Sequence, residues 1–195
     1  MRMTPQYFSA GKIIAENGDV RVYEFEGDLF LDKGVSHFLW ARSSELREYK
    51  NQIKNYPKGN CLEIGLGLGI STKYILTCQR TKYLTTVEKN PDVIGVFFKL
   101  NPGGLDQHKI VLGNGVDFLI TTEETFDFVF LDFYSLIDED TLPEIALVVG
   151  LAKSKLNKKG KIIAWFDPFT PEEFVLPFFS LFEAVVGEGG AENGG

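Results

Sequence analysis

The feature that most constrains the fold is the glycine-rich segment of residues 60–71. Residues 61–64 are apolar apart from Glu63 and suit a short buried strand. They lead into Gly65-Leu66-Gly67-Leu68-Gly69, and a helix-like pattern follows from Ser71. A strand that passes through a glycine turn into a helix N-terminus brings backbone N–H groups close to a ligand, and a Cβ in the turn would block that approach. The segment therefore predicts a loop that binds a ligand.

Strand-like and helix-like segments alternate through the rest of the chain. Strands are predicted at 60–64, 83–88, 109–112, 127–132 and 161–165, and helices at roughly 43–55, 71–79, 92–100, 116–121, 142–156 and 171–182. This alternation is typical of a parallel sheet with helices on both faces. We therefore predict an α/β fold, a Rossmann-like doubly wound and mostly parallel sheet. In such sheets a ligand lies beyond the carboxyl ends of the strands.

The first 40 residues differ from the rest because short alternating runs are separated by turn signals. Asn17-Gly18-Asp19 and Gly27-Asp28 are such signals. Residues 1–40 are therefore predicted to form a small antiparallel β-meander, and residues 41–186 the Rossmann-like domain. The glycine- and glutamate-rich end, 187–195, is predicted to be a flexible tail.

Composition argues against several classes of partner. The formal net charge is −7, whereas a general nucleic-acid binder needs clustered Lys and Arg. No apolar run approaches the ~18–20 residues of a membrane helix, and the N-terminus lacks the apolar core of a signal peptide. Cys61 and Cys78 are the only cysteines, so no disulfide framework or zinc cluster is expected. We predict a cytoplasmic protein that is not a general nucleic-acid binder and does not bind membranes.

The glycine loop fits some nucleotide-binding patterns better than others. A phosphate-binding P-loop needs a Gly-Lys-Ser/Thr sequence that the chain lacks here, and a dinucleotide loop needs glycine where the chain has Ile70. Glu88 closes the next strand nineteen residues after Gly69, where a carboxylate can accept hydrogen bonds from both ribose hydroxyls. This favours a nucleoside ligand. The alternative is that Glu88 is a solvated residue at a strand end.

Two further polar residues stand at predicted strand ends. Asn114, between Gly113 and Gly115, has an amide that can donate to and accept from an adenine edge, but Asn-Gly is also favoured in turns and helix caps. Asp132 ends an otherwise apolar strand. Its carboxylate could hold a ligand's amino group, orient a nucleophile or take its proton, and the alternative is a cap for the following loop.

With these residues in place, the chain resembles the class I S-adenosylmethionine-dependent methyltransferases. The resemblance rests on the Glu-x-Gly-x-Gly-x-Gly loop and on the acidic ends of the second and fourth strands. The segments 22–36, 87–94 and 126–132 are similar to spermidine synthase-like proteins in particular. The resemblance implies S-adenosylmethionine as cofactor and a small molecule as substrate.

The resemblance also implies a role for each residue of the predicted site. Gly65, Gly67 and Gly69 let the backbone approach the methionine part of the cofactor, and Glu63 orients the loop or the cofactor's amino group. Glu88 holds the ribose.

At the other end of the cofactor, the resemblance assigns the adenine to Asn114 and Gly115. Asp132 faces the nucleophile and is the predicted catalytic residue. In-line transfer depends mainly on holding donor and acceptor at attack distance, so a dedicated base is optional.

Two departures from spermidine synthases shape the functional prediction. Their glycine loop carries an Asp where this chain has Leu68, and their Asp-Ser-Ser-Asp-Pro motif is replaced by residues 132–136, Asp-Phe-Tyr-Ser-Leu. A diamine has two cationic ends that need carboxylate partners. Methyl transfer is therefore the main prediction, aminopropyl transfer from decarboxylated S-adenosylmethionine the second, and a non-catalytic nucleoside-binding module the third.

Metal dependence and assembly complete the predictions. A site like that of the Mg²⁺-dependent catechol O-methyltransferases would use Asp132 and Asp167, but Trp165 and Phe166 replace the expected acidic neighbours, so no metal is predicted.

Few residues remain after the last helix for the strands that usually follow. The resulting sheet edge must be paired or covered, which predicts a homodimer or a shielded edge.

Overall fold

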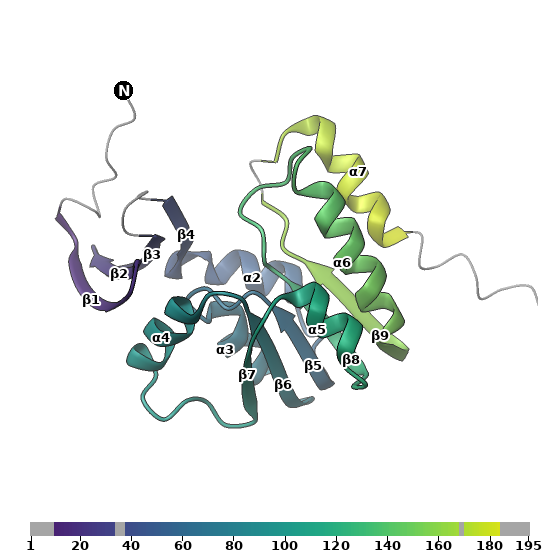
Figure 1. Ribbon diagram of the computed structural model, residues 1–195, viewed down its shortest axis with the longest axis horizontal. Helices are drawn as coiled ribbons and strands as arrows, with labels where there is room; N and C mark the ends of the chain where they lie inside the picture. The colour runs from purple at the N-terminus through teal and green to yellow at the C-terminus, as the bar shows by residue number, and fades with distance from the viewer. Residues whose placement is uncertain (1–9, 34–37, 168–169, 184–195) are drawn as a thin grey trace, which may run out of the picture.

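The computed structural model describes residues 10–33, 38–167 and 170–183, which form two sheets with flanking helices (Figure 1). The predicted tail at 187–195 lies outside the described residues. The smaller sheet contains β1 (Lys12–Asn17), β2 (Val20–Phe25), β3 (Asp28–Lys33) and β4 (Phe38–Arg42), each antiparallel to its neighbour. This sheet confirms the predicted meander, although β4 continues two residues past position 40.

The larger sheet confirms the predicted parallel, Rossmann-like arrangement. Its strands are β5 (Gly59–Ile64), β6 (Thr81–Glu88), β7 (His108–Leu112), β8 (Phe126–Leu131) and β9 (Leu156–Ala164). They lie side by side in the order β7-β6-β5-β8-β9, and all neighbours are parallel. The chain therefore moves outward from β5 to β7 and returns to β8 on the other side. Such a reversal opens a crevice at the carboxyl ends of β5 and β8, where ligands bind in folds of this type.

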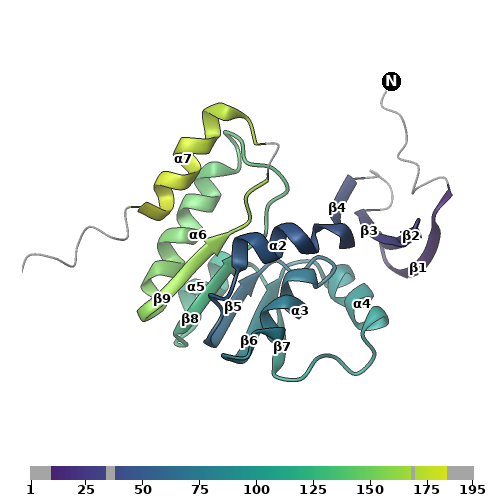
Figure 2. The same cartoon turned by 180° about the vertical axis from the view of Figure 1, so that it is seen from behind.

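Helices cover both faces of the large sheet (Figures 1 and 2). A 3₁₀ turn, η1 (Ser43–Glu45), leads into α2 (Leu46–Ile53), which shares one face with α3 (Ile70–Thr77). The other face carries α5 (Gly115–Thr121), α6 (Leu142–Ser154) and α7 (Glu172–Glu183). The remaining helix, α4 (Pro91–Leu100), packs against the meander. None of these described helices is long and apolar enough to cross a membrane.

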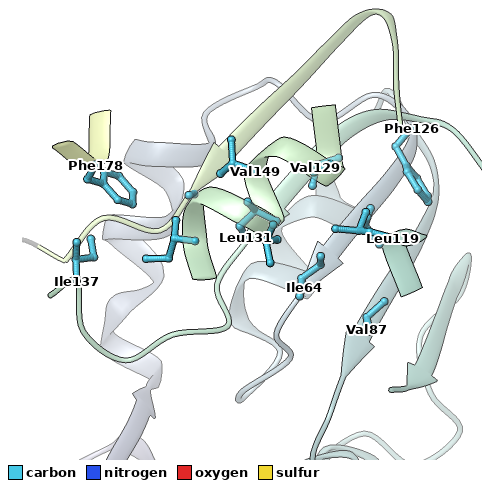
Figure 3. Packing of buried hydrophobic residues seen from close by; sticks show 14 residues of the cluster. Ile64, Val87, Leu119, Phe126, Val129, Leu131, Ile137, Val149 and Phe178 are labelled. Carbon is cyan, nitrogen blue, oxygen red and sulfur yellow. The ribbon is translucent and has the colours of Figure 1, made fainter. Parts of the chain in front are cut away.

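The main core lies between the large sheet and helices α5 to α7. Figure 3 shows Leu131 of β8 beside Val149 of α6, Ile64 and Val87 of β5 and β6 near Leu119 of α5, and Phe178 of α7 near Ile137. Each side chain of this kind contributes about 1.5–3 kcal/mol when fully buried. The interior strand β8 is apolar on both faces from Phe128 to Leu131 because helices cover both, as expected for a parallel sheet.

The meander is joined to the larger sheet through a second core. Val22 and Leu31 of the meander pack in one cluster with Leu66 and Leu68 of the glycine loop and with Phe97 of α4. Polar contacts reinforce this junction, since Asn17 Nδ2 donates to Asp92 Oδ1 over 2.8 Å. The meander therefore supports the glycine loop from outside the parallel sheet.

The strand β9 begins five residues earlier than the sequence predicts, at Leu156 instead of Lys161, and α6 ends at Ser154 instead of 156. The backbone N–H of Phe126 donates to the carbonyl of Lys155 over 2.8 Å, which draws the end of the helix to the sheet. The register then shifts between the pairs Phe126–Leu156 and Phe128–Lys161. The predicted turn at 157–160 is therefore an irregular part of the strand.

Candidate functional site

The glycine loop adopts a conformation that only glycines reach easily. Gly65 has φ +98° and Gly69 has φ +70°, both in the left-handed region. A Cβ on Gly65 would lie 1.9 Å from the carbonyl oxygen of Asp132, and one on Gly69 would lie 2.4 Å from the ring of Phe97. The loop is therefore fitted between the end of β8 and α4.

Glu88 ties the loop to the next strand. Its Oε2 accepts from the backbone N–H of Leu66 over 3.0 Å, and its Oε1 accepts from that of Asn90 over 2.8 Å. The residue is only 9% exposed. Each carboxylate oxygen has a further lone pair, so Glu88 can still accept hydrogen bonds from a diol while it holds the loop.

Asp132 and Tyr49 form the chemically most distinctive pair in this region. Tyr49, on α2, donates its hydroxyl to Asp132 Oδ2 over 2.6 Å. The tyrosine is itself 5% exposed, with its ring 4.4 Å from that of Trp165.

Burial raises the pKa of Asp132 to about 7, because the Tyr49 hydrogen bond only partly offsets it and the negative charges of Glu63, Glu45 and Glu88 add to the rise. A carboxylate that titrates near neutral pH is suited to exchanging a proton with a bound nucleophile.

Asp132 opens onto a cavity of about 180 Å³ beside the glycine loop. Its lining comes from the meander, α2, the glycine loop, the start of α3, the residue after β6 and the segment after β8: Leu31, Ala41, Tyr49, Leu66, Gly67, Leu68, Ile70, Ser71, Lys89, Asp132, Phe133, Tyr134 and Ser135. A smaller cavity of about 30 Å³ is lined by Gly65, Asn114 and Gly115, among others. Lys89 and Phe133 line both cavities, so the two lie next to each other across the carboxyl edge of the sheet.

Asn114 is placed as the N-cap of α5. Its Oδ1 accepts from the backbone N–H of Val116 over 2.7 Å, which is the helix-cap alternative considered from the sequence. This bond leaves the side-chain N–H₂ as a donor toward the smaller cavity that Asn114 lines. A Cβ on Gly115 would lie 2.6 Å from Cγ2 of Ile64, so the start of α5 is pressed against β5.

Glu63 is not among the residues that line the two cavities. It is fully buried, and its carboxylate accepts hydrogen bonds from the hydroxyls of Ser71, Thr72 and Thr86 over 2.5, 2.6 and 2.8 Å. Ser71 and Thr72 belong to the first turn of α3, so Glu63 holds the helix that leaves the glycine loop. Burial raises its pKa to about 7, against the effect of the three hydroxyls.

Tyr49 and Lys89 were not identified from the sequence as site residues. Tyr49 lies four residues before Ile53 on the buried face of α2, and this spacing indicates only a packed helix. Lys89 directly follows Glu88 at the end of a predicted strand, and this position could have identified it from the sequence as a site residue. Within the described part of the chain, no group of three or more His, Cys, Asp or Glu side chains is arranged to hold a metal ion.

Comparison with solved structures finds the same architecture in known enzymes. Spermidine synthase from Thermotoga maritima has a TM-score of 0.70 at 16% identity, over 89% of this chain and 64% of that chain. A spermidine synthase in complex with the transition state analogue AdoDATO has a TM-score of 0.63 at 15% identity, over 90% and 62%. The N-methyltransferase NodS from Bradyrhizobium japonicum has a TM-score of 0.51 at 17% identity, over 71% and 79%.

These likenesses show the fold of the class I S-adenosylmethionine-dependent methyltransferases and spermidine synthases. The chain spans less than two thirds of the length of either spermidine synthase. None of the protein-family models matches the chain, and a comparison with curated protein sequences found no match.

The contact between Gly65 and Asp132 predicts that Gly65→Ala is strongly destabilising. The new Cβ meets a backbone carbonyl, which cannot move without shifting β8. We expect a loss of at least about 3 kcal/mol in the free energy of unfolding, measured with urea. Gly27→Ala is the matched control, because Gly27 also has positive φ but no atom within 4 Å of the added Cβ. Equal losses in the two variants would contradict the proposed clash.

Glu63 predicts a pH dependence of stability. The unfolded chain releases this proton near the ordinary value of 4.5, whereas the folded chain keeps it until about pH 7, so stability falls as pH rises between these values. Glu63→Gln should reduce the fall in unfolding free energy between about pH 5 and 8 by roughly 2–3 kcal/mol, measured by urea unfolding. The exposed Glu123 provides the control: Glu123→Gln should behave as wild type. An unchanged pH dependence in Glu63→Gln would refute the prediction.

Proposed function

We propose that this chain is an S-adenosylmethionine-dependent transferase that methylates a small-molecule nucleophile. The observation that carries the proposal is the Tyr49–Asp132 pair, which opens onto a cavity lined by the glycine loop. Transfer from a sulfonium needs a site that excludes water and holds the acceptor in line. A carboxylate with a pKa of about 7 at that point can also remove a proton from the acceptor.

The residues around the two cavities fit the proposed cofactor. Glu88 keeps lone pairs for a ribose, and Asn114, which lines the smaller cavity, has an amide donor for an adenine edge. The adenine would lie over the mouth of that cavity and not inside it. Gly67 lines the larger cavity and Gly65 the smaller one, and neither has a side chain that would block the methionine part beside the backbone. When bound, S-adenosylmethionine supplies the electrophilic methyl group.

In this proposal Asp132 orients the acceptor and takes its proton. Its Oδ2 is held by Tyr49, which leaves Oδ1 to receive the proton of an amine or hydroxyl acceptor. With S-adenosylmethionine bound, the cofactor would supply the methyl group by in-line displacement, and Asp132 would take the proton that the acceptor loses. Tyr49 holds the Asp132 carboxylate and is itself packed on Trp165. The carboxylate that would orient the acceptor is therefore fixed in place.

Aminopropyl transfer is the second candidate. The two similarities to spermidine synthases cover about nine tenths of this chain and so include much of the meander, which favours it. Against it, Asp132 is the single acidic residue among the described residues that line the larger cavity, and Lys89 adds a cation there. Leu68 is buried in the core that the meander shares with α4. A diamine would find few of the carboxylates that two ammonium groups require.

Ligand binding tests the cofactor assignment directly. A ligand that binds only the folded state raises the melting temperature by mass action. We expect S-adenosylhomocysteine to stabilise the protein and NAD to have no effect, and Glu88→Gln to weaken the response while Glu123→Gln preserves it. Stabilisation by NAD alone, or by no nucleoside, would rule out the proposal. A clear preference for decarboxylated S-adenosylmethionine would favour the second candidate instead.

The Tyr49–Asp132 hydrogen bond predicts a shift that can be measured without a known acceptor. The bond stabilises the carboxylate, so Tyr49→Phe should raise the pKa of Asp132 further above 7, by roughly one unit. The measurement is a ¹³C NMR titration of labelled aspartate carboxyls. Tyr134→Phe is the control, because that hydroxyl lines the same cavity but donates to the carbonyl of Trp165. A pKa of Asp132 that is unchanged in Tyr49→Phe would contradict the role assigned to Tyr49.

A further inference from the structure

The outer edge of β9 presents unpaired peptide groups. In the part of the chain that the structure describes, β9 pairs with β8 on one side, and no strand pairs with its other side. Trp165 donates its backbone N–H to the carbonyl of Leu131 over 2.8 Å. Successive residues of a strand point their peptide groups to opposite sides, so those of Ile162 and Ala164 face outward.

Gln52 makes strand-like hydrogen bonds to the chain at this edge. Phe166 is the next residue in the outward-facing series, just beyond the end of β9. Its N–H donates to Gln52 Oε1 and its carbonyl accepts from Gln52 Nε2, both over 2.9 Å. At Phe166 the side-chain amide of Gln52 thus makes the two hydrogen bonds that a neighbouring strand would make. It makes them at this one residue.

The outward edge of β9 forms the floor of a groove of about 630 Å³, which we call the β9 groove. α2 and α7 lie on opposite sides of β9 (Figure 2). The residues that line the β9 groove are Asn51, Gln52, Lys54, Tyr56, Lys153, Leu156, Gly160, Lys161, Ile162, Ile163, Ala164, Phe166, Phe178, Phe179 and Phe182. A groove with a strand edge as its floor and a helix on each side can take one extended segment beside the strand.

The two walls of the β9 groove differ in chemistry. The wall beside α2 carries the cations of Lys54 and Lys161, and Lys161 Nζ lies 3.4 Å from the centre of the Tyr56 ring. The wall beside α7 is aromatic, and Phe179 is 44% exposed there. Lys153 donates to the carbonyl of Leu181 over 2.9 Å and so fixes α7 in place. The cationic wall stands out in a chain whose net charge is −7.

We propose that the β9 groove binds an extended segment of a partner protein, with alternating acidic and apolar residues, as a sixth strand of the sheet. Side chains of an added strand alternate between the two faces, so one set meets Lys54 and Lys161 while the other meets the phenylalanines of α7. Backbone pairing to Ile162 and Ala164 provides affinity, and the two walls provide specificity. This inference is independent of the proposed transferase activity.

A second copy of the chain fits the β9 groove less well. Pairing of β9 with itself would bring together two strands that each carry Lys158, Lys159 and Lys161. Like charges on neighbouring strands are destabilising, and lysines on an edge strand are a common defence against self-pairing. Charge complementarity therefore favours an acidic partner over the homodimer.

The test uses a synthetic peptide as the probe. A fluorescein-labelled peptide that alternates Glu with Val and Phe is titrated with the full chain, and binding is followed by fluorescence anisotropy. A peptide with Lys in place of Glu, and one of the same composition with its apolar residues contiguous, are the comparison probes. We expect saturable binding of the alternating acidic peptide alone, weakened by salt because the lysines contribute.

Two variants locate the binding. Lys161→Glu reverses a charge on the wall, and Ile162→Pro removes an outward N–H without removing a bond to β8, so each should weaken binding by about tenfold or more. Lys109→Glu, on the opposite edge strand β7, is the matched control and should bind as wild type. Hydrogen exchange of the wild type should show protection of Ile162 and Ala164 on binding, which does not depend on any variant folding.

Three results would overturn the proposal. The first is absence of saturable binding together with unchanged exchange at Ile162 and Ala164. The second is equal binding of all three peptides. The third is a concentration-dependent dimer that Lys161→Glu strengthens or Ile162→Pro dissociates, because a second copy would then cover the edge.

Discussion

The close approach of two backbones, at Gly65 and Asp132, is the constraint on which the site depends. β5 and β8 are neighbours in the sheet although a large part of the chain separates them, and their carboxyl ends meet where the strand order reverses. The missing side chain at Gly65 lets the glycine loop pass beside the carbonyl of Asp132. The same contact therefore brings β5 and β8 together at the switch point and sets the Asp132 carboxylate beside the glycine loop.

The buried carboxyl groups near the glycine loop are stabilised by neutral hydrogen-bond donors. Glu63 is held by three hydroxyls, Glu88 by two backbone N–H groups, and Asp132 by the hydroxyl of Tyr49. Neutral donors stabilise a carboxylate less than a paired cation does, so burial and mutual repulsion keep the pKa values of Glu63 and Asp132 near 7. A cationic ligand such as the proposed sulfonium would favour the ionised form of Asp132 and so lower its pKa from about 7.

The sequence predicted the parts of the fold and site that follow from local chemistry. Glycines with special backbone angles, and acidic residues at the ends of apolar strands, can be located because parallel strands bring their carboxyl ends to one edge. The burial of Glu63 against three hydroxyls could not be predicted, because Thr86 comes from a different strand. Tyr49 was missed for a similar reason: its helical spacing fits a core residue, and only the tertiary packing of α2 on β8 brings its hydroxyl to Asp132.

Helix α2 connects the candidate site with the edge of the sheet. Tyr49 and Gln52 are three residues apart and so lie on the same side of the helix. Tyr49 stacks on Trp165, while Gln52 binds both peptide groups of Phe166, the next residue. The short segment after β9 is therefore held from one helix at two successive residues. Because Gln52 occupies the outward peptide groups of Phe166, an added strand must end before it, and the position of Trp165 beneath Tyr49 is kept when the groove is filled.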